Sequence, residues 1–343
     1  MGESKRQKLD EEERKITVIA HPNIALIKYW GKASETEMIP LNDSISLTID
    51  LFNAKTTLTA KRIDDGEGVD DTVSVNGTNL ALSTRFNRVF NSVRDRLGVQ
   101  WSFTVTSSTN FPVAAGLASS AAGFAAIAFA LGKAFDLPDE DIERWARYGS
   151  GSASRSVLSG LVQWKKGDRN TESHVVSHFP SSHWPDLRLI ILVAKEEEKA
   201  VSSKEGMERT ARTSALLQDR IRRNSERIQG IINSFAAHDF PTMAELIMRD
   251  SNEMHAVCLD SYPPIQYLNS TSWSIINLVH SFNSESVRAA YTFDAGPNAC
   301  IFILNEHVEE FQTLVSSTFS NGEFVDKKNM FVSTLGQGPR IHK

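Results

Sequence analysis

Four segments of the sequence combine residue types that could bind an anionic substrate and act on it. The first, residues 110–123, reads NFPVAAGLASSAAG, a loop of glycine and other small residues that leads into a helix. Backbone N–H groups at a helix start are unpaired and lie at the positive end of its dipole, so phosphates could approach this segment closely. The hydroxyls of Ser119 and Ser120 add donors or a metal-directed oxygen. A small-residue helix packed tightly on a sheet explains the same residues equally well.

The other three segments bring charged side chains together with turns. Residues 149–156 (GSGSASRS) offer serines and Arg155, whose planar guanidinium can hold a carboxylate or a phosphate through two hydrogen bonds. Residues 23–32 (NIALIKYWGK) place lysines on both sides of Tyr-Trp-Gly, which suits an anionic ligand resting on aromatic rings. Residues 291–298 (YTFDAGPN) carry Asp294 from a strand into a Gly-Pro turn, where a carboxylate base could be positioned. Taken alone, each segment is more simply a solvated loop, a surface lysine beside core aromatics, or an aspartate in a turn.

Several other kinds of site are absent from the sequence. No GxxxxGK[ST] phosphate loop occurs, and Gly149 and Gly151 lack the third glycine of a dinucleotide-binding motif. The two cysteines form no CxxC pair, and the histidines contain no HExxH. A site in which protein residues alone hold a metal is therefore not expected, whereas magnesium carried by nucleotide phosphates stays open. Ser202 and Glu205 have the spacing of a helix capping box, which is a sufficient structural explanation for that segment.

Composition narrows the class of protein. The 343 residues carry a net charge of −5, which gives no general attraction to nucleic acid or to an anionic membrane. The longest alanine-rich apolar stretch, residues 118–131, is too short to cross a bilayer, and residues 1–15 contain no apolar segment of a secretion signal. Two cysteines predict no disulfide framework. We therefore expect a cytoplasmic protein that binds neither nucleic acid nor membrane.

The elements that must position these segments follow no strict β-α-β order, which favours an α+β fold in two domains. Residues 1–14 are charged and aperiodic and predict a disordered tail; an N-terminal domain follows over 15–186 and a C-terminal domain over 187–343. The boundary lies where a turn-rich PSSHWPD segment meets an apolar strand. The expected strands are 15–20, 45–49, 56–61, 72–75, 103–106, 187–193, 289–293 and 299–304. The expected helices are 80–97, 117–135, one beginning at Pro138, 204–223, 225–237, 241–256, 270–282 and 308–317. Gly98 should end the first of them, and Asn76-Gly77 after the strand 72–75 is typical of a hairpin turn.

Five blocks in a fixed order carry much more information than any one of them. They are PNIALIKYWGK (22–32), NFPVAAGLASSAAG (110–123), GSGSASRS (149–156), DSNEMHAVCLDSYPPI (250–265) and YTFDAGPNA (291–299), with GQGP at 336–339. Through these blocks the chain resembles the diphosphomevalonate decarboxylases, a family of the GHMP kinase superfamily, over residues 15–340.

The resemblance implies a two-domain GHMP kinase-like fold and a reaction. The N-terminal, ATP-binding domain would have the left-handed βαβ topology of ribosomal protein S5 domain 2, the C-terminal domain would be ferredoxin-like, and the ligand cleft would lie between them. Such enzymes convert (R)-5-diphosphomevalonate and ATP to isopentenyl diphosphate, ADP, phosphate and CO₂. Phosphorylation of the C3 hydroxyl would come first, followed by loss of phosphate and then of CO₂. ATP as co-substrate, Mg²⁺ and a homodimer are also implied.

The resemblance further assigns roles to residues. The nucleotide contacts would be Asn110, Ala115, Gly116, Leu117, Ala118, Ser119 and Ser120. The substrate contacts would be Tyr29, Trp30, Gly31, Lys32, Arg85, Ser150, Gly151, Ser152, Ala153, Ser154, Arg155 and Lys204. The catalytic set would comprise Asp294 facing the C3 hydroxyl as base or orienting group, Arg155 on the substrate carboxylate, Ser120 on the γ-phosphate, and Lys28 and Asn23 near the reacting centre. No protein ligand to a metal is implied.

Three features depart from the family pattern, and two other functions stay open. Ser154 stands where the family often has cysteine, Lys204 where it commonly has threonine, and residues 311–334 form a short C-terminal region. Lys204 would either add a charge to the substrate diphosphate or point away from it. The alternatives are a kinase of the same superfamily, such as a mevalonate 3-kinase, and a nucleotide sensor without catalysis. A carboxylate clamp at Arg155 disfavours the kinase, and the complete catalytic set disfavours the sensor.

Overall fold

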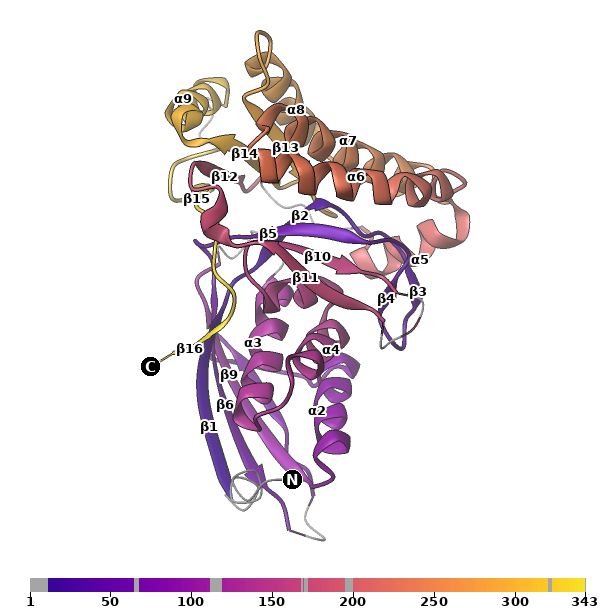
Figure 1. Cartoon of the computed structure of the whole chain (residues 1–343), viewed down its shortest axis with the longest axis vertical. Helices are drawn as coiled ribbons and strands as arrows, with labels where there is room; N and C mark the ends of the chain where they lie inside the picture. The colour runs from indigo at the N-terminus through magenta and orange to yellow at the C-terminus, as the bar shows by residue number, and fades with distance from the viewer. Residues whose placement is uncertain are drawn as a thin grey trace.

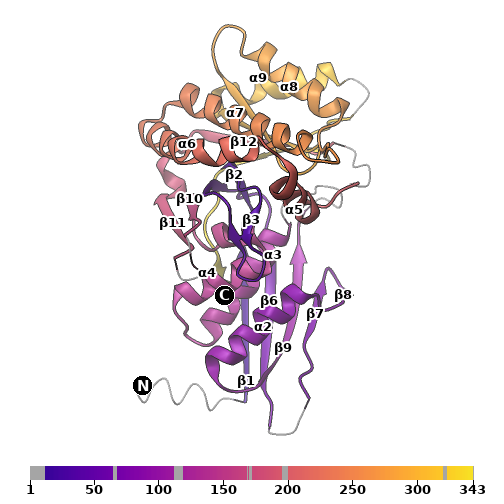
Figure 2. The ribbon, with the colours of Figure 1, turned by 90° about the vertical axis from the view of Figure 1, so that its right-hand side faces the viewer.

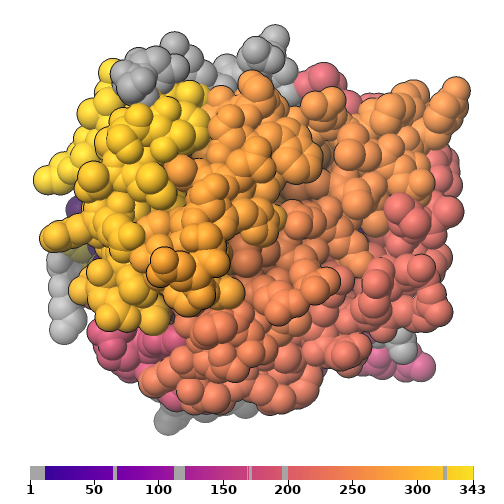
Figure 3. Space-filling model, turned by 90° about the horizontal axis from the view of Figure 1, so that it is seen from above, coloured from indigo at the N-terminus to yellow at the C-terminus, as the bar shows by residue number. Residues whose placement is uncertain are grey.

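The computed structural model describes residues 12–64, 68–111, 119–167, 169, 172–194, 200–319 and 323–342. These residues form an elongated molecule in which three larger sheets and their helices follow one another along the long axis, with a fourth, two-stranded sheet of β3 (Lys32–Ser34) and β4 (Ile39–Pro40) (Figure 1). The N-terminal half occupies one end, and the helices of the C-terminal half cover the other end (Figures 1 and 3). Within the described ranges, no helix is both long enough and apolar enough to cross a membrane.

The first sheet has six strands in the order β16-β1-β6-β9-β7-β8. Their bounds are β1 Glu13–Ala20, β6 Ala54–Arg62, β7 Thr72–Val75, β8 Thr78–Leu80, β9 Trp101–Thr109 and β16 Arg340–Ile341. Buried residues alternate with more exposed ones along β6 and β9, as expected for a sheet that is covered on one face. The covering helices are α2 (Thr84–Leu97), α3 (Ser119–Ala134) and α4 (Asp139–Gly149), which lie beside this sheet in Figure 1.

The second sheet lies between the two halves of the molecule (Figures 1 and 2). Its order is β11-β10-β5-β2, with bounds β2 Asn23–Ile27, β5 Ser44–Thr48, β10 Leu161–Lys165 and β11 His174–Phe179. Every residue of β2 and β5 is buried. Ile24 and Leu47 of this sheet belong to the same hydrophobic core as Ile228 and Ile247 of the C-terminal helices. The apolar core is therefore continuous across residue 186.

The third sheet has the antiparallel order β13-β14-β12-β15. Its strands are β12 Leu187–Leu192, β13 Ala289–Phe293, β14 Ala299–Leu304 and β15 Met330–Ser333. Helices α5 (Ser203–Thr213), α6 (Leu217–Ala237), α7 (Phe240–Leu259) and α8 (Ser270–Phe282) connect its first two strands, and α9 (Val308–Thr318) connects the last two. Numbered along the chain, the spatial order is 4-1-3-2 with βαββαβ connectivity, which is the ferredoxin-like arrangement that the resemblance implied.

Short-range signals predicted several turns and ends well. Asn76 and Gly77, both with positive φ, form the turn between β7 and β8, and Gly98 in the left-handed conformation ends α2. Ser202 caps α5 by accepting a hydrogen bond from the Glu205 N–H at 3.2 Å.

Other boundaries were predicted wrongly. Strand β1 begins at Glu13 rather than Lys15, because the side chain of Arg14 is buried against the rings of Trp101 and Phe135. The expected tail therefore includes two strand residues, and residues 1–11 lie outside the described ranges. The expected strands did not include β2, β3, β4, β8, β10, β11, β15 and β16.

The break between the expected helices 204–223 and 225–237 was also misplaced. It falls at Ser214, whose hydroxyl donates to the Asp260 carboxylate at 2.7 Å. The same carboxylate accepts the Leu216 N–H at 3.1 Å. A distant acidic residue thus ends α5 and allows the chain to turn into α6, a contact that helical periodicity does not reveal.

Candidate active site

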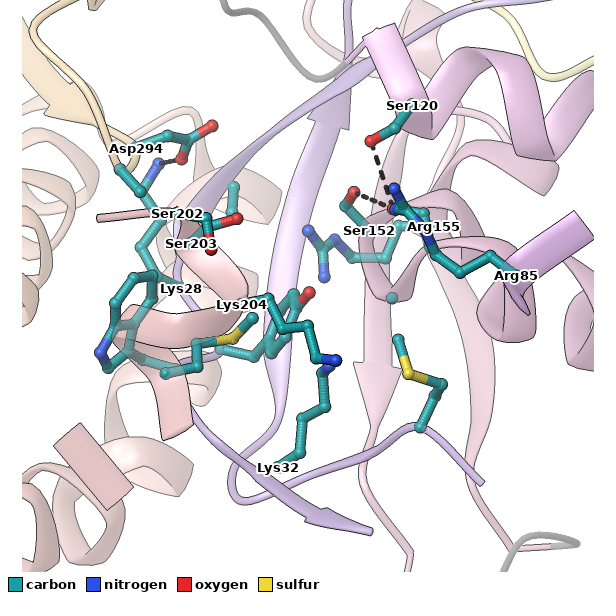
Figure 4. A pocket seen from close by; sticks show the side chains of 18 of the residues that line it. Lys28, Lys32, Arg85, Ser120, Ser152, Arg155, Ser202, Ser203, Lys204 and Asp294 are labelled. Carbon is teal, nitrogen blue, oxygen red and sulfur yellow. Dashed lines mark hydrogen bonds and ion pairs between the residues drawn. The ribbon is translucent and has the colours of Figure 1, made fainter. Parts of the chain in front are cut away.

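A cavity of about 620 Å³ opens between the two halves of the molecule (Figure 4). Its walls come from the end of β2 and the turn after it, the starts of α2, α3 and α5, the 3-10 helix Gly151–Val157, and the turn after β13. Residues far apart in the sequence therefore meet around one space. The described lining residues are Asn23, Ala25, Lys28, Tyr29, Trp30, Lys32, Glu35, Met38, Thr84, Arg85, Arg88, Ser120, Ser150, Gly151, Ser152, Arg155, Ser202, Ser203, Lys204, Met207, Met254, Asp294 and Ala295.

An ion pair joins the two halves at one side of the cavity. The Lys28 Nζ lies 2.6 Å from Asp294 Oδ1, and its side chain is 4% exposed against 49% for Asp294 (Figure 4). Desolvation by itself would raise the pKa of Asp294, but the Lys28 ammonium, with a smaller effect of Arg155, outweighs it and lowers that pKa. Asp294 is therefore an ionised carboxylate at neutral pH, held by Lys28 and open to a ligand.

Arg155 lies in a buried cradle of neutral polar groups. Its Nη1 donates to Ser44 Oγ at 2.6 Å, and its Nε donates to Ser46 Oγ at 3.0 Å and to Asn23 Oδ1 at 3.3 Å. Burial lowers the pKa of Arg155 to about 10, with Tyr29 and Asp294 opposing the shift, so the guanidinium is still charged at neutral pH. No carboxylate among the described residues is in hydrogen-bonding contact with this buried cation, which is an energetically expensive arrangement that an anionic ligand would relieve.

Asn23 fixes this cradle from the neighbouring strand. Its Nδ2 donates to the Ser152 carbonyl at 2.9 Å and to Ser156 Oγ at 2.8 Å, which leaves its Oδ1 facing Arg155. The residue thus orients the arginine and ties β2 to the 3-10 helix.

Aromatic rings form another wall. Tyr29 packs edge-on against Trp164 with centroids 4.9 Å apart, and a Cβ at Gly151 would lie 2.7 Å from the Tyr29 hydroxyl. Glycine at position 151 therefore allows this close approach. The Trp30 Nε1 donates a hydrogen bond of 3.0 Å to Thr210 Oγ1 on α5. This hydrogen bond joins the N-terminal half of the molecule to the C-terminal half.

Hydroxyl groups gather where α3 begins. Ser120 Oγ lies 3.4 Å from Ser150 Oγ, which lies 3.2 Å from Ser152 Oγ (Figure 4). The start of a 16-residue helix and a row of hydroxyls provide donors for phosphate oxygens. The residues just before this helix, 112–118, lie outside the described part of the chain, and with them the predicted contacts Ala115, Gly116, Leu117 and Ala118.

The cavity is strongly cationic. Six positively charged side chains and two carboxylates are found among its described lining residues, namely Lys28, Lys32, Arg85, Arg88, Arg155 and Lys204 against Glu35 and Asp294. Figure 4 shows Lys28, Lys32, Arg85, Arg155 and Lys204 around the same space. Such a space suits a ligand, or two ligands, with several negative charges.

Magnesium fits this site only together with phosphates. In the described residues, no three His, Cys, Asp or Glu side chains form a group able to hold a metal ion. Magnesium is commonly held by few protein groups and by substrate phosphates, and Ser120 offers a hydroxyl oxygen beside the helix start.

Thirteen of the predicted site residues line the cavity: Asn23, Lys28, Tyr29, Trp30, Lys32, Arg85, Ser120, Ser150, Gly151, Ser152, Arg155, Lys204 and Asp294. Four others do not. Gly31 (φ 94°) shapes the turn, Ala153 is fully buried, and Ser154 donates to the Gly151 carbonyl at 2.7 Å. Asn110 binds the backbone of Leu51 and Asn53. Ser119 is the first residue of α3, and its side chain lies outside the described part of the structure.

Sequence reasoning missed a layer of polar residues behind the cavity. Arg220, Asp250 and Ser251 contact the backbone of Lys28 or of the residue before Asp294. The sequence contained one signal of this layer. Asp250 and Ser251 interrupt the apolar face of the helix predicted over 241–256, and a carboxylate at such a position needs a polar partner.

Comparisons with known proteins agree with this geometry. A family model described as the mevalonate 5-diphosphate decarboxylase C-terminal domain matches residues 189–341. A second, described as the diphosphomevalonate decarboxylase-like N-terminal domain, matches residues 20–175. The chain belongs to the diphosphomevalonate decarboxylase family. The human diphosphomevalonate decarboxylase is 40% identical over 335 residues, which cover 90% of this chain and 82% of the human protein.

Solved structures of the family share the fold over nearly the whole chain. The mevalonate diphosphate decarboxylase from Staphylococcus aureus matches with a TM-score of 0.88 at 33% identity, over 98% of this chain and all of that one. The complex of MDDEF with MVAPP, AMPPCP and magnesium matches with a TM-score of 0.87 at 33% identity, over 96% of this chain and 99% of that one. The expected α+β, two-domain GHMP kinase-like fold is thereby confirmed.

Proposed function

We propose that this chain catalyses the ATP-dependent decarboxylation of (R)-5-diphosphomevalonate to isopentenyl diphosphate, with release of ADP, phosphate and CO₂. The observation that carries the proposal is the combination, in one cationic cavity, of the Lys28–Asp294 pair and the buried guanidinium of Arg155. A site that transfers a phosphoryl group needs the Lys28–Asp294 pair. A substrate that loses a carboxylate gives a reason for the guanidinium of Arg155, which can hold that carboxylate. The family relatives, one of them solved with MVAPP, AMPPCP and magnesium, support the assignment.

In this proposal the anionic ends of the two substrates meet different cations. ATP phosphates lie at the start of α3, where Ser120 contacts the γ-phosphate, and Mg²⁺ bound to them neutralises charge during transfer. The substrate diphosphate lies toward Lys32 and Arg85, with Tyr29 and Trp30 beside its carbon chain. The substrate carboxylate binds Arg155, whose Nη2 donates to none of the described residues.

The first step transfers the γ-phosphoryl group to the C3 hydroxyl. The transition state of such transfers is loose, so the alcohol keeps most of its proton until late and positioning matters more than base strength. The lowered pKa of Asp294 agrees with this role, because it keeps the carboxylate ionised, so that it can accept the hydrogen bond of the C3 hydroxyl and, late in the step, its proton. Asp294 therefore orients the C3 hydroxyl and takes its proton as the O–P bond forms.

The second step breaks two bonds of the phosphorylated intermediate. The C3–O bond breaks first, so phosphate leaves with the C3 oxygen and the bonding electrons, and positive charge develops at C3. The C–C bond to the carboxylate then breaks, its electrons form the alkene, and CO₂ departs. A fixed carboxylate at Asp294 stabilises charge that exists only during this step, which is the kind of interaction that lowers a barrier.

The two other functions make different predictions in the same assay. With purified protein, Mg²⁺, ATP and (R)-5-diphosphomevalonate, we expect ADP, phosphate and CO₂ to appear in equal amounts. ADP without CO₂ would instead identify a kinase that stops at the phosphorylated product. Binding of ATP without any turnover would identify a sensor.

The ionisation of Asp294 gives a prediction that needs no substrate. Because Lys28 lowers this pKa in the folded protein, the stabilising contact is present above the pKa of an unfolded aspartate, about 4, and is lost as the pH falls through the folded value. In ¹³C NMR of carboxyl-labelled aspartate, with the signal assigned by Asp294→Asn, we expect Asp294 to titrate below the ordinary range. Lys28→Met should move this titration to higher pH, and an unchanged titration would contradict the pairing.

Lys204 is predicted to contribute little. Its side chain is 70% exposed and lies 3.8 Å from Glu208, so water and salt screen its charge. We expect Lys204→Thr to change kcat/KM less than about fivefold at 0.15 M salt, since an exposed ion pair is typically worth under about 1 kcal/mol. Steady-state kinetics at 0.05 M and 0.5 M salt would check this. A loss above about thirtyfold would mean that the ammonium binds the diphosphate directly.

We further propose a domain boundary near residue 186, a homodimer and a cytoplasmic location. The boundary is supported by the interval between the two family-model matches, which end at residue 175 and begin again at residue 189. The homodimer and the location rest on family resemblance and on composition alone.

A further inference from the structure

A buried polar cluster lies on the helical side of the cavity wall. Asp250 and Ser251 are consecutive residues of α7, each 1% exposed, and Arg220 of α6 is 2% exposed. None of the three lines the cavity. They occupy helix positions surrounded by apolar residues such as Ile247 and Met254, where packing alone would favour another hydrophobic side chain.

The Asp250–Arg220 pair holds the backbone of Lys28. The Lys28 N–H donates to Asp250 Oδ2 at 2.8 Å, and the Lys28 carbonyl accepts from Arg220 Nη2 at 2.9 Å. The two charged groups also bind each other, with Arg220 Nη1 2.9 Å from Asp250 Oδ1 and Nη2 3.0 Å from Oδ2. Lys28 follows the last residue of β2, and the ion pair binds both of its backbone groups as a neighbouring strand would; the Asn42 Nδ2 also donates to the same carbonyl at 3.0 Å.

Ser251 holds the other partner of the catalytic ion pair. Its hydroxyl oxygen accepts the N–H of Phe293 at 3.0 Å, and Phe293 is the last residue of β13, directly before Asp294. Two neighbouring side chains on one helix therefore contact the backbone of both chain segments that deliver Lys28 and Asp294. Those segments are 266 positions apart and have no sheet in common.

A buried ion pair is seldom kept for stability, because desolvation of both charges offsets their attraction and apolar residues of similar size do as well. We infer that Arg220, Asp250 and Ser251 are positioning residues that set the distance and orientation of Lys28 relative to Asp294. This inference deepens the proposed function and rests on it for its kinetic consequence. Its structural content, a fixed geometry between two charged side chains, can be measured without substrate.

Two substitutions that change the side-chain volume little test the inference. Asp250→Asn keeps the shape but removes the charge, and Arg220 still has the Glu253 carboxylate at 3.1 Å. Ser251→Ala removes one hydrogen bond. Arg249→Ala is the matched control, because Arg249 lies on the same helix with its side chain 67% exposed and bound only to Glu245 among the described residues.

In the kinetic arm, kcat should fall about 100-fold for Asp250→Asn, the size expected when a reacting group is misplaced by about 1 Å. For Ser251→Ala it should fall about five- to tenfold, as for loss of one neutral hydrogen bond. KM should stay within about threefold of the wild-type value in both, because the substrate contacts are intact. An inert ATP analogue should still bind at one molecule per chain, which separates misplacement from loss of folded enzyme.

The second arm is the carboxyl titration of Asp294 by ¹³C NMR. The charged or titratable groups that interact with Asp294 are Lys28, Arg155, His255, Tyr29 and Cys300, and only the Lys28 contact should loosen. We expect the titration of Asp294 to move to higher pH in Asp250→Asn and Ser251→Ala and to stay in place in Arg249→Ala.

Wild-type kcat together with an unchanged Asp294 titration in both variants would overturn the inference. If Asp250→Asn does not fold, Ser251→Ala decides by the same criteria. If the wild-type chain releases no CO₂, the proposed function fails, and the titration alone then decides whether these residues position the pair.

Discussion

Replacing Asp294 with asparagine is expected to lower kcat by about 10³-fold or more, which corresponds to about 4 kcal/mol of transition-state stabilisation. The substitution keeps the size of the side chain but removes the charge that faces C3. Both steps become slower. The C3 hydroxyl is no longer oriented by a carboxylate, and the positive charge that develops at C3 has no fixed counter-charge. Lys28 loses its partner at 2.6 Å and remains a buried cation.

Binding should survive this change, because Asp294 repels rather than attracts the anionic substrates. We expect the dissociation constant of an inert ATP analogue, measured by calorimetry, to stay within about threefold of the wild-type value. Asp139→Asn is a suitable control, since that side chain is 77% exposed, pairs with Lys133 and does not line the cavity. A kcat near that of the wild type in Asp294→Asn would remove this residue from the mechanism.

Replacing Arg155 with glutamine is expected to raise KM for (R)-5-diphosphomevalonate and to lower kcat/KM by about 10²- to 10³-fold. The magnitude follows from loss of a desolvated, charge-assisted contact, about 3 to 4 kcal/mol. The carboxylate loses its charge as CO₂ forms, so its attraction to Arg155 is strongest in the bound substrate and weakens toward the transition state. The larger share of the effect should therefore be in KM.

Arg155→Lys separates charge from geometry in this prediction. A lysine keeps the positive charge but cannot donate to Ser44, Ser46 and a substrate carboxylate together, as the planar fork of Arg155 is placed to do. We expect an intermediate loss, about tenfold to 100-fold in kcat/KM, with ATP binding unchanged. If Arg155→Gln left KM for the substrate unaltered, Arg155 would not be the carboxylate contact.

Much of the site could be predicted from the sequence because five short segments occur together in a fixed order, although each alone has a simpler structural explanation. Lys28, Arg155 and Asp294 each lie in one of these segments, and all three line the cavity. The ends of α2 and α5 followed from Gly98 and Ser202, because such signals act within one turn of helix.

Long-range contacts are the part that the sequence did not reveal. The break at Ser214 depends on Asp260, which is 46 positions away, and the partner of Asp294 is 266 positions away. The role of Asp250 was equally hidden, since a carboxylate on an apolar helix face indicates that a partner exists without indicating which one. Strand β2, buried on both faces between the two halves, lacks the polar-apolar alternation by which half-buried strands are found.

The fate of the C3 oxygen of the substrate decides whether the reaction proceeds through phosphorylation at C3. (R)-5-diphosphomevalonate labelled with ¹⁸O at the C3 hydroxyl would be turned over with unlabelled ATP and Mg²⁺ in ordinary water, and the released phosphate analysed by mass spectrometry. In the proposed mechanism this oxygen accepts the γ-phosphoryl group and leaves with it. Each released phosphate should therefore carry one ¹⁸O, and the amount of labelled phosphate should equal the amount of CO₂ released. Unlabelled phosphate would mean that water attacks ATP, and it would contradict a reaction that proceeds through phosphorylation at C3.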